Sequence, residues 1–303
     1  MHAADTDFNG RWILKVANEP RTRVWWLEVE GTGTSVIRGS FVGAPGGDVN
    51  KVAAFSIEKG ELVWQFDRQY GGTGDQRGTY RASVRDGKLK GSLHVSGLDS
   101  AAREFSGVRA PEITDREDGT WTRGKPVELF NGKDLAGFHA MVPGKDIGWQ
   151  IRGGLLGNIA GANNLVSDQK FWNFELRVVF RLGKESNSGL GLRGRYEVQI
   201  LEDFGKPADI HGMGALYGRQ TPTKNAGLEP GAWQTIAVRL VGRTVTVVVN
   251  DERVIERYDI PGLTAIANDA DEDLPGSITI QGDHGAIEFR KITVTPLTRQ
   301  EAR

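Results

Sequence analysis

Apolar and polar residues alternate in short stretches along the whole chain, with the period of two that marks β-strands with one buried face. No segment keeps an apolar residue at every third or fourth position for three turns, so the pattern predicts no amphipathic helix. Turn signals such as Lys59-Gly60 and Asp86-Gly87 separate the stretches. The chain is therefore predicted to be an all-β protein.

The stretches between residues 11 and 109 follow one another with short turns, which is typical of an up-and-down β-barrel or a small sandwich. The segment Pro111–Gly119 is polar and offers few apolar anchors, as a linker does. We expect a small all-β domain of unknown role over residues 1–110, a linker over 111–124, and a second all-β domain over 125–303.

The second domain has longer strands with two distinct faces. The stretch Phe174–Leu182 places large apolar residues at every second position, whereas Glu175, Arg177 and Arg181 occupy the other face. A further pair of strands flanks the turn Asn250–Arg253 and predicts a hairpin. Two antiparallel sheets packed face to face account for this pattern.

Composition narrows the function classes. Lys and Arg number 38 against 39 Asp and Glu, and without a basic stripe this balance excludes a nucleic-acid partner. No apolar run approaches the ~20 residues that cross a bilayer, so no membrane span is expected. Cysteine is absent, which excludes disulfides and thiolate chemistry. The opening Met1–Asp5 is similar to the stub left after removal of a signal peptide, so we expect a periplasmic or secreted protein.

The segment Asn187–Asp203 carries the candidate chemistry. If it is extended, an apolar face alternates with a polar one. The polar row from Arg195 to Gln199 covers roughly 13 Å, comparable to a disaccharide, and its groups can satisfy sugar hydroxyls. A solvated sheet face with ion pairs remains the alternative. The row contains Arg193, Arg195, Glu197, Gln199 and Asp203.

Two glycine-rich segments add candidates. The long connection between Phe204 and Trp233 has little strand character and carries His211, Tyr217 and Lys224, and such connections are usually functional or disordered. Its residues could return over the polar row. Gln281–Gly285 contains His284 just before the last strand, and an ordinary turn is the alternative there.

These segments resemble, in order, the motifs of the 3-keto-disaccharide hydrolase domain, long catalogued only as a domain of unknown function. The resemblance covers about residues 127–297, and the N-terminal domain lies outside it. Family members often end the central motif with Leu-Asp where this chain has Leu201-Glu202-Asp203, which leaves open the carboxylate that takes the family position. The matching segments are Glu128–Phe138, Trp149–Leu156, Phe171–Leu176, Asn187–Gly189, Tyr196–Leu201, Gly214–Gly218 and Asp283–Gly285.

The resemblance implies a jelly-roll β-sandwich of the concanavalin or laminin-G kind. It also implies cleavage of glycosidic bonds in 3-keto-glycosides, by elimination across C1–C2 and then hydration, with help from a divalent metal. On this basis Glu197, Asp203 and His211 are the candidate catalytic residues, and Glu197 and His211 the candidate metal ligands. The candidate substrate-binding residues are Asn187, Arg193, Arg195, Gln199, Tyr217, Lys224, Gln281 and His284.

Two other functions remain open. The same sandwich serves non-catalytic carbohydrate-binding modules, because fold does not decide function. Conventional hydrolysis would use Glu197 and Asp203 as a pair. On a straight strand these two lie about 20 Å apart, beyond the roughly 5–9.5 Å that such mechanisms require.

Overall fold

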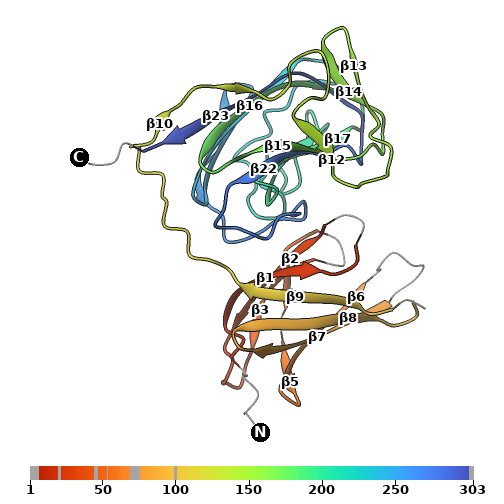
Figure 1. Cartoon of the computed structure of the whole chain (residues 1–303), viewed down its shortest axis with the longest axis vertical. Helices are drawn as coiled ribbons and strands as arrows, with labels where there is room; N and C mark the ends of the chain where they lie inside the picture. The colour runs from red at the N-terminus through yellow and green to blue at the C-terminus, as the bar shows by residue number, and fades with distance from the viewer. Residues whose placement is uncertain are drawn as a thin grey trace. The chain divides into compact units, whose positions relative to one another are not determined.

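The computed structural model describes residues 7–19, 22–43, 47–52, 54–68, 76–98 and 101–299, and their regular structure is entirely β-strand (Figure 1). This confirms the all-β prediction. Contacts divide the chain into two units, one running to Pro111 together with Leu263–Ala270, the other comprising Glu112–Gly262 and the chain from Asp271 onward. The predicted domain limits stay a prediction.

Within the described ranges we find no helix that is long and apolar enough to cross a membrane. Met1–Asp5, on which the expectation of export rests, lies outside the described residues.

The first unit contains one antiparallel sheet in the order β4-β3-β2-β1-β9-β8-β7-β6-β5. Each neighbour but one is the next strand along the chain, as in an up-and-down meander. Its strands are β1 (Gly10–Val16), β2 (Val24–Glu30), β3 (Arg38–Val42), β4 (Asn50–Val52), β5 (Ser56–Glu58), β6 (Glu61–Arg68), β7 (Gln76–Arg85), β8 (Lys88–Val95) and β9 (Arg103–Arg109).

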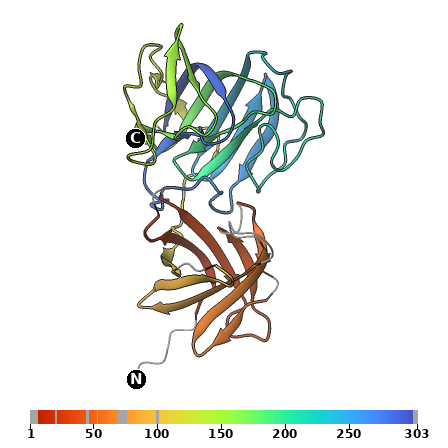
Figure 2. The same ribbon diagram turned by 90° about the vertical axis from the view of Figure 1, so that its right-hand side faces the viewer.

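This sheet curls into a barrel around aromatic residues (Figure 2). Phe41 on β3 lies 5.0 Å from Tyr80 on β7 and 5.7 Å from Trp64 on β6, measured between ring centroids. Strands β3 and β7 have four strands between them in the sheet order, so only a closed curve brings these rings together. The rings fill the interior and belong to its buried hydrophobic core. The barrel prediction is confirmed.

The second unit contains two sheets, a nine-stranded one and a five-stranded one with the order β12-β15-β22-β17-β18. The long path of the larger sheet is β13-β14-β23-β16-β19-β20-β21, and β10 and β11 pair with β23. The strands are β10 (Thr122–Arg123), β11 (Val127–Glu128), β12 (Phe138–Ala140), β13 (Trp149–Arg152), β14 (Leu155–Asn158), β15 (Leu165–Phe171), β16 (Phe174–Leu182), β17 (Asn187–Leu192), β18 (Tyr196–Leu201), β19 (Gln234–Val241), β20 (Thr244–Val249), β21 (Glu252–Asp259), β22 (Gly276–Ile280) and β23 (Ile287–Thr298).

The core of the second unit lies between these sheets, which form separate layers in Figure 1. Leu176 and Val178 on β16 are fully buried, whereas Arg177 between them is exposed. On the smaller sheet Leu190 and Val198 are fully buried and directly paired across β17 and β18. Apolar faces from both layers therefore close one core, and the β-sandwich prediction is confirmed.

The polar segment Asn187–Asp203 is a hairpin and not one extended strand. Arg193 and Gly194 have φ angles of 55° and 67°, so the chain reverses there in a tight turn of the kind that requires a left-handed backbone. The pairing places Gly189 opposite Gln199 and Gly191 opposite Glu197. The continuous row expected from Arg193 to Asp203 is therefore interrupted at its start.

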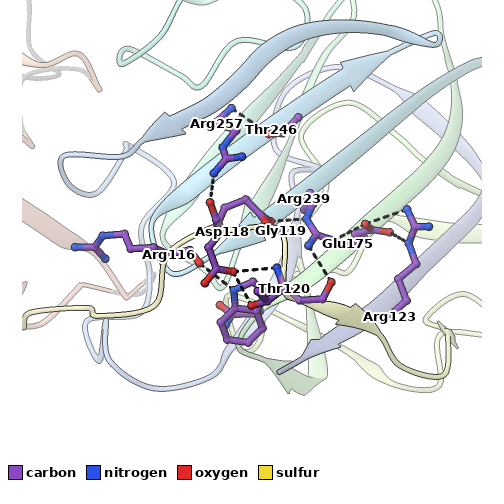
Figure 3. A network of polar contacts seen from close by, with 12 residues as sticks. Arg116, Asp118, Gly119, Thr120, Arg123, Glu175, Arg239, Thr246 and Arg257 are labelled. Atoms are coloured by element: carbon purple, nitrogen blue, oxygen red, sulfur yellow. Dashed lines mark hydrogen bonds and ion pairs between the residues drawn. The ribbon is translucent and has the colours of Figure 1, made fainter. Parts of the chain in front are cut away.

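The segment that reads as a linker is attached to the second unit (Figure 3), and we call residues 112–121 the strap. Ile113 is buried, and the Asp115 carboxylate accepts hydrogen bonds from the Trp172 indole at 2.7 Å and the Asn173 amide at 2.8 Å. Glu117 forms an ion pair with Arg239 at 2.5 Å. Apart from Ile113, these contacts are polar, so an apolar pattern cannot reveal them.

Candidate active site

The outer face of the smaller sheet holds a group of buried polar side chains, which we call the polar cluster: Asn187, Glu197, Gln199, Thr279 and Gln281. In a strand, neighbouring residues point to opposite faces. The neighbours of the cluster on β18 and β22 face the apolar core, so the cluster faces away from it. Glu197 and Gln199 are nevertheless only 3% exposed, and Thr279 is fully buried.

Gly189 lies at the centre of the cluster because its strand, β17, runs between β22 and β18. The Gln281 N–H donates to the Gly189 carbonyl at 2.9 Å, and Gly189 is paired with Gln199 on the other side. A Cβ on Gly189 would lie 2.5 Å from Oε1 of Glu197. The carboxylate therefore lies over a bare backbone between two glutamines, and only glycine leaves it that space.

Two polar atoms in the cluster have no hydrogen-bond partner among the described residues, namely Oγ1 of Thr279 and Oε1 of Gln281. The Gln199 amide donates to Oδ1 of Asn187 at 3.3 Å. Buried polar groups nearly always have partners, and leaving one unsatisfied costs about 1–3 kcal/mol. Such atoms beside a carboxylate indicate a place prepared for a polar ligand.

The turn Gln281–Gly285 is fixed at the rim of the cluster by two asparagines. Oδ1 of Asn164 accepts from the Gly282 N–H at 2.8 Å, and the Asn158 amide donates to the carbonyls of Gly282 and Gly285, each at 3.1 Å. The Gly285 N–H donates to the Asn187 carbonyl at 2.8 Å. Sequence analysis missed both asparagines, Asn158 at the end of β14 and Asn164 just before β15, because their positions follow no alternating pattern.

His284 lies on this turn with its ring half exposed, and its Nδ1 lies 2.9 Å from the Asp283 carboxylate. The structure thus places one predicted histidine at the rim rather than inside the cluster.

The other predicted histidine, His211, lies on the long connection that follows β18. This connection runs along β18, where the Gly214 N–H donates to the Gln199 carbonyl at 2.9 Å and the Tyr217 N–H to the Glu197 carbonyl at 3.0 Å. The rings of His211 and Tyr217 have centroids 4.7 Å apart, and both residues are partly exposed. The connection therefore brings this ring pair beside the strand that carries Glu197.

Asp203 and Lys224 are not in the cluster. The Asp203 carboxylate accepts from the Met213 N–H and from the Asn225 amide, each at 3.0 Å, and so fixes the long connection. Burial raises the pKa of Asp203 above its ordinary value, although those hydrogen bonds act against the rise. Lys224 is exposed and pairs with Glu252 at 2.7 Å.

Arg193 and Arg195, two members of the polar row expected to meet the sugar, are fully buried. Arg193 donates to the carbonyls of Trp172 and Gly242, each at 2.7 Å, and its guanidinium lies 4.0 Å above the Trp172 ring. Burial lowers the pKa of Arg193 to about 10. Arg195 donates to the carbonyls of Leu274, at 2.8 Å, and Asp271. The tight turn directs both side chains into main-chain carbonyls, where they anchor the hairpin tip.

Tyr196 belongs to the same buried tip. Its hydroxyl donates to Glu272 at 2.5 Å, and Glu272 also holds Arg243 at 2.6 Å. Burial, and then the charge of Glu272, raise the pKa of Tyr196, so this phenol stays protonated.

The predicted divalent metal finds no complete ligand set. Across the described ranges, no three or more His, Cys, Asp or Glu side chains gather as they would around an ion. Glu197 and His211 were the expected ligands, and Asp203 is committed to the long connection. These residues do not fit a divalent ion by themselves.

One known structure supports the sandwich. A structure described as a glycosyl hydrolase from Parabacteroides distasonis is 22% identical, with a TM-score of 0.50, and the match covers 66% of this chain and 94% of that one. A second glycosyl hydrolase structure from the same organism is 25% identical, with a TM-score of 0.46, over 57% of this chain and 100% of that one. The first likeness shows the fold alone. No curated protein matches the chain.

A family model described as the 3-keto-alpha-glucoside-1,2-lyase-like domain matches residues 125–295, which is more than half of the chain. This confirms the resemblance seen in the motifs. At a general level it indicates an enzyme that acts on carbohydrate and cleaves glycosides. The chain thus belongs to the family of 3-keto-alpha-glucoside-1,2-lyase-like domains.

Proposed function

We propose that the second unit cleaves glycosides whose sugar carries a ketone at C3, by elimination across C1–C2 followed by addition of water. The observation that supports this most is the Glu197 carboxylate, buried over Gly189 beside polar atoms of Thr279 and Gln281 that lack partners. The description of the matching family model agrees with this reaction.

The ketone makes the C2 hydrogen acidic, and Glu197 is the base that accepts it. The C2–H bond breaks, its electron pair forms the enolate, and the negative charge gathers on the C3 oxygen. The C3 carbonyl then re-forms, and the electron pair of the enolate makes the C1=C2 double bond as the C1–O bond breaks. The departing oxygen takes up a proton. The product is a C1=C2 enone, to which water adds at C1 while a proton returns to C2, so the net reaction is hydrolysis.

The neighbours of Glu197 would stabilise the enolate. The Thr279 hydroxyl and the side-chain amides of Gln199 and Gln281 are hydrogen-bond donors on the same face. Donors aimed at developing charge in a site without water supply a large part of catalysis, with ~10²–10³ in rate for each. His211 and Tyr217, beside β18, are the proposed proton source for the departing oxygen.

Incubation of the full chain with 3-keto-trehalose, and with trehalose as the unoxidised control, tests the proposal. We expect free sugar from the first substrate only. In heavy water the released 3-keto sugar should carry deuterium at C2, beyond the background exchange of the product. Cleavage without deuterium at C2 would indicate direct displacement at C1 and exclude elimination.

Two expectations from the sequence remain proposals beside this one. Export to the periplasm or medium is tested by fractionation of cells that produce the native protein. Metal dependence is tested by the same turnover assay after exhaustive chelation, where full activity would remove metal from the reaction.

The structure disfavours hydrolysis by a carboxylate pair, because Asp203 is held by Met213 and Asn225 and leaves Glu197 as the carboxylate of the polar cluster. A non-catalytic binding module would bind 3-keto-trehalose without releasing sugar, which the same assay detects.

A further inference from the structure

The outer face of the larger sheet contains a groove of about 550 Å³ that is unrelated to the polar cluster, which lies on the other sheet. We call it the basic groove. Strands β16, β19, β20 and β23 form its floor, and both its ends carry charged residues. The cations that line it are Arg123, Arg177, Arg239, Arg253 and Lys291.

Small side chains surround the central cation, Arg177. It is paired with Ala237 on β19 and with Thr293 on β23, and Val248 follows next to Ala237 on β20. These residues are too short to cover a long guanidinium. Arg177 is therefore exposed over a shallow, nearly flat floor.

The charges in the groove do not balance. Arg123 and Arg239 share one carboxylate, that of Glu175, at 2.6 and 2.8 Å (Figure 3), and Glu117 from the strap supplies a second partner for Arg239. Lys291 pairs with Glu128 at 3.1 Å.

Arg253 pairs with Glu256 at 2.7 Å. Of the five lining cations, only Arg177 has a side chain without a hydrogen bond or ion pair to any residue that the structure describes. The surplus positive charge of the groove is thus concentrated at its centre.

We propose that the basic groove binds an acidic sugar residue of a polysaccharide, with the sugar carboxylate on Arg177. A guanidinium presents two parallel N–H donors that match a carboxylate. A flat floor of Ala237, Val248 and Thr293 suits a sugar ring, and the Thr293 and Thr295 side chains offer hydroxyls beside it. The choice of a glycan over another polyanion rests on the proposed function, whereas the choice of an anion rests on the charges.

The test is titration of the full chain with oligogalacturonate at low salt, with maltohexaose as the neutral control. We expect saturable binding of the acidic oligomer only. Arg177→Gln should weaken it about tenfold or more, since one charge-assisted bidentate contact is lost. Arg152→Gln is the matched control, because Arg152 is an exposed arginine on β13 outside the groove, and this variant should bind normally.

Glu197→Gln should bind oligogalacturonate unchanged, so the result does not depend on whether the proposed reaction occurs. Normal binding by Arg177→Gln, or equal binding of maltohexaose, would overturn the proposal. Equal binding of oligoglutamate would show that charge alone acts and would overturn the assignment to a glycan. Preference for a sulfated oligosaccharide over oligogalacturonate would overturn the assignment to a carboxylate.

Discussion

Both the tip and the middle of the β17–β18 hairpin carry buried charged residues, but these residues have different roles. At the tip, Arg193 and Arg195 are buried and donate to main-chain carbonyls, so their hydrogen-bonding capacity serves the fold. In the middle, Glu197 lies over Gly189 next to two polar atoms without partners. Nη1 of Arg193 also lacks a hydrogen-bond partner among the described residues, so an unpaired atom alone does not mark a site. The middle differs because a carboxylate lies there over a glycine, on the face turned away from the apolar core. A row of charged residues therefore does not define a site by itself.

The strongest test of this comparison is Glu197→Gln, which keeps the shape of the side chain and removes the base. We expect turnover of 3-keto-trehalose to fall by about 10²–10⁴-fold, the usual contribution of a positioned general base. Unfolding in urea should change little, because the amide fills the same space. Glu252→Gln, at an exposed ion pair, is the control and should keep full activity. Full activity in Glu197→Gln would remove this residue from the reaction.

Arg195→Ala tests the other side of the comparison. Its loss leaves the carbonyls of Leu274 and Asp271 without their donor in a buried place. We expect the free energy of unfolding to fall by about 3 kcal/mol, measured by urea denaturation. Arg152→Ala, at an exposed position, should stay within about 0.5 kcal/mol of the unsubstituted chain. A variant that folds normally but loses sugar binding would restore the substrate role expected from the sequence.

Gly189→Ala tests the position of the Glu197 carboxylate in the middle of the hairpin. The new Cβ would lie 2.5 Å from Oε1 of Glu197 and push the carboxylate from its place. We expect turnover to fall about tenfold, because small misplacements of reacting groups reduce rates strongly. Gly183→Ala is a matched control, since a Cβ there meets nothing within 4 Å. Equal activity in the two variants would contradict the position assigned to the carboxylate.

Asp203→Asn gives the smallest expected effect, and its sign comes from the pKa. The unfolded chain titrates near the ordinary value of 3.8, whereas burial raises the pKa of Asp203 in the folded protein. The folded state therefore holds the proton more tightly, and its stability falls as the pH rises from 3.8 through the raised pKa.

Asparagine does not titrate, so Asp203→Asn should flatten that part of the curve of unfolding free energy against pH. At pH 7 the change should stay within about 1 kcal/mol, because one lost hydrogen bond offsets the removal of a buried charge. An unchanged curve would contradict the raised pKa.

Alternation alone predicted both folds, because strands such as Phe174–Leu182 have one apolar face. It also placed Glu197 and Gln199 on one face of a strand. The rest depended on backbone conformation. The left-handed turn at Arg193 and Gly194 changes what two arginines contact, and no alternating pattern encodes it. Thr279 was missed because a threonine inside a buried strand reads as an ordinary β-branched residue.

The strap has a consequence for how this unit could be moved between proteins. A piece excised where the family match begins, at residue 125, would lack Ile113, Asp115 and Glu117, and the Trp172 indole and the Asn173 amide would each lose the Asp115 partner they have in the intact chain. A piece that keeps these contacts therefore begins about a dozen residues before the family match. Gene fusions and duplications that carry the strap would keep its contacts with the sandwich, and those that omit it would leave the partners of Asp115 and Glu117 without these carboxylates.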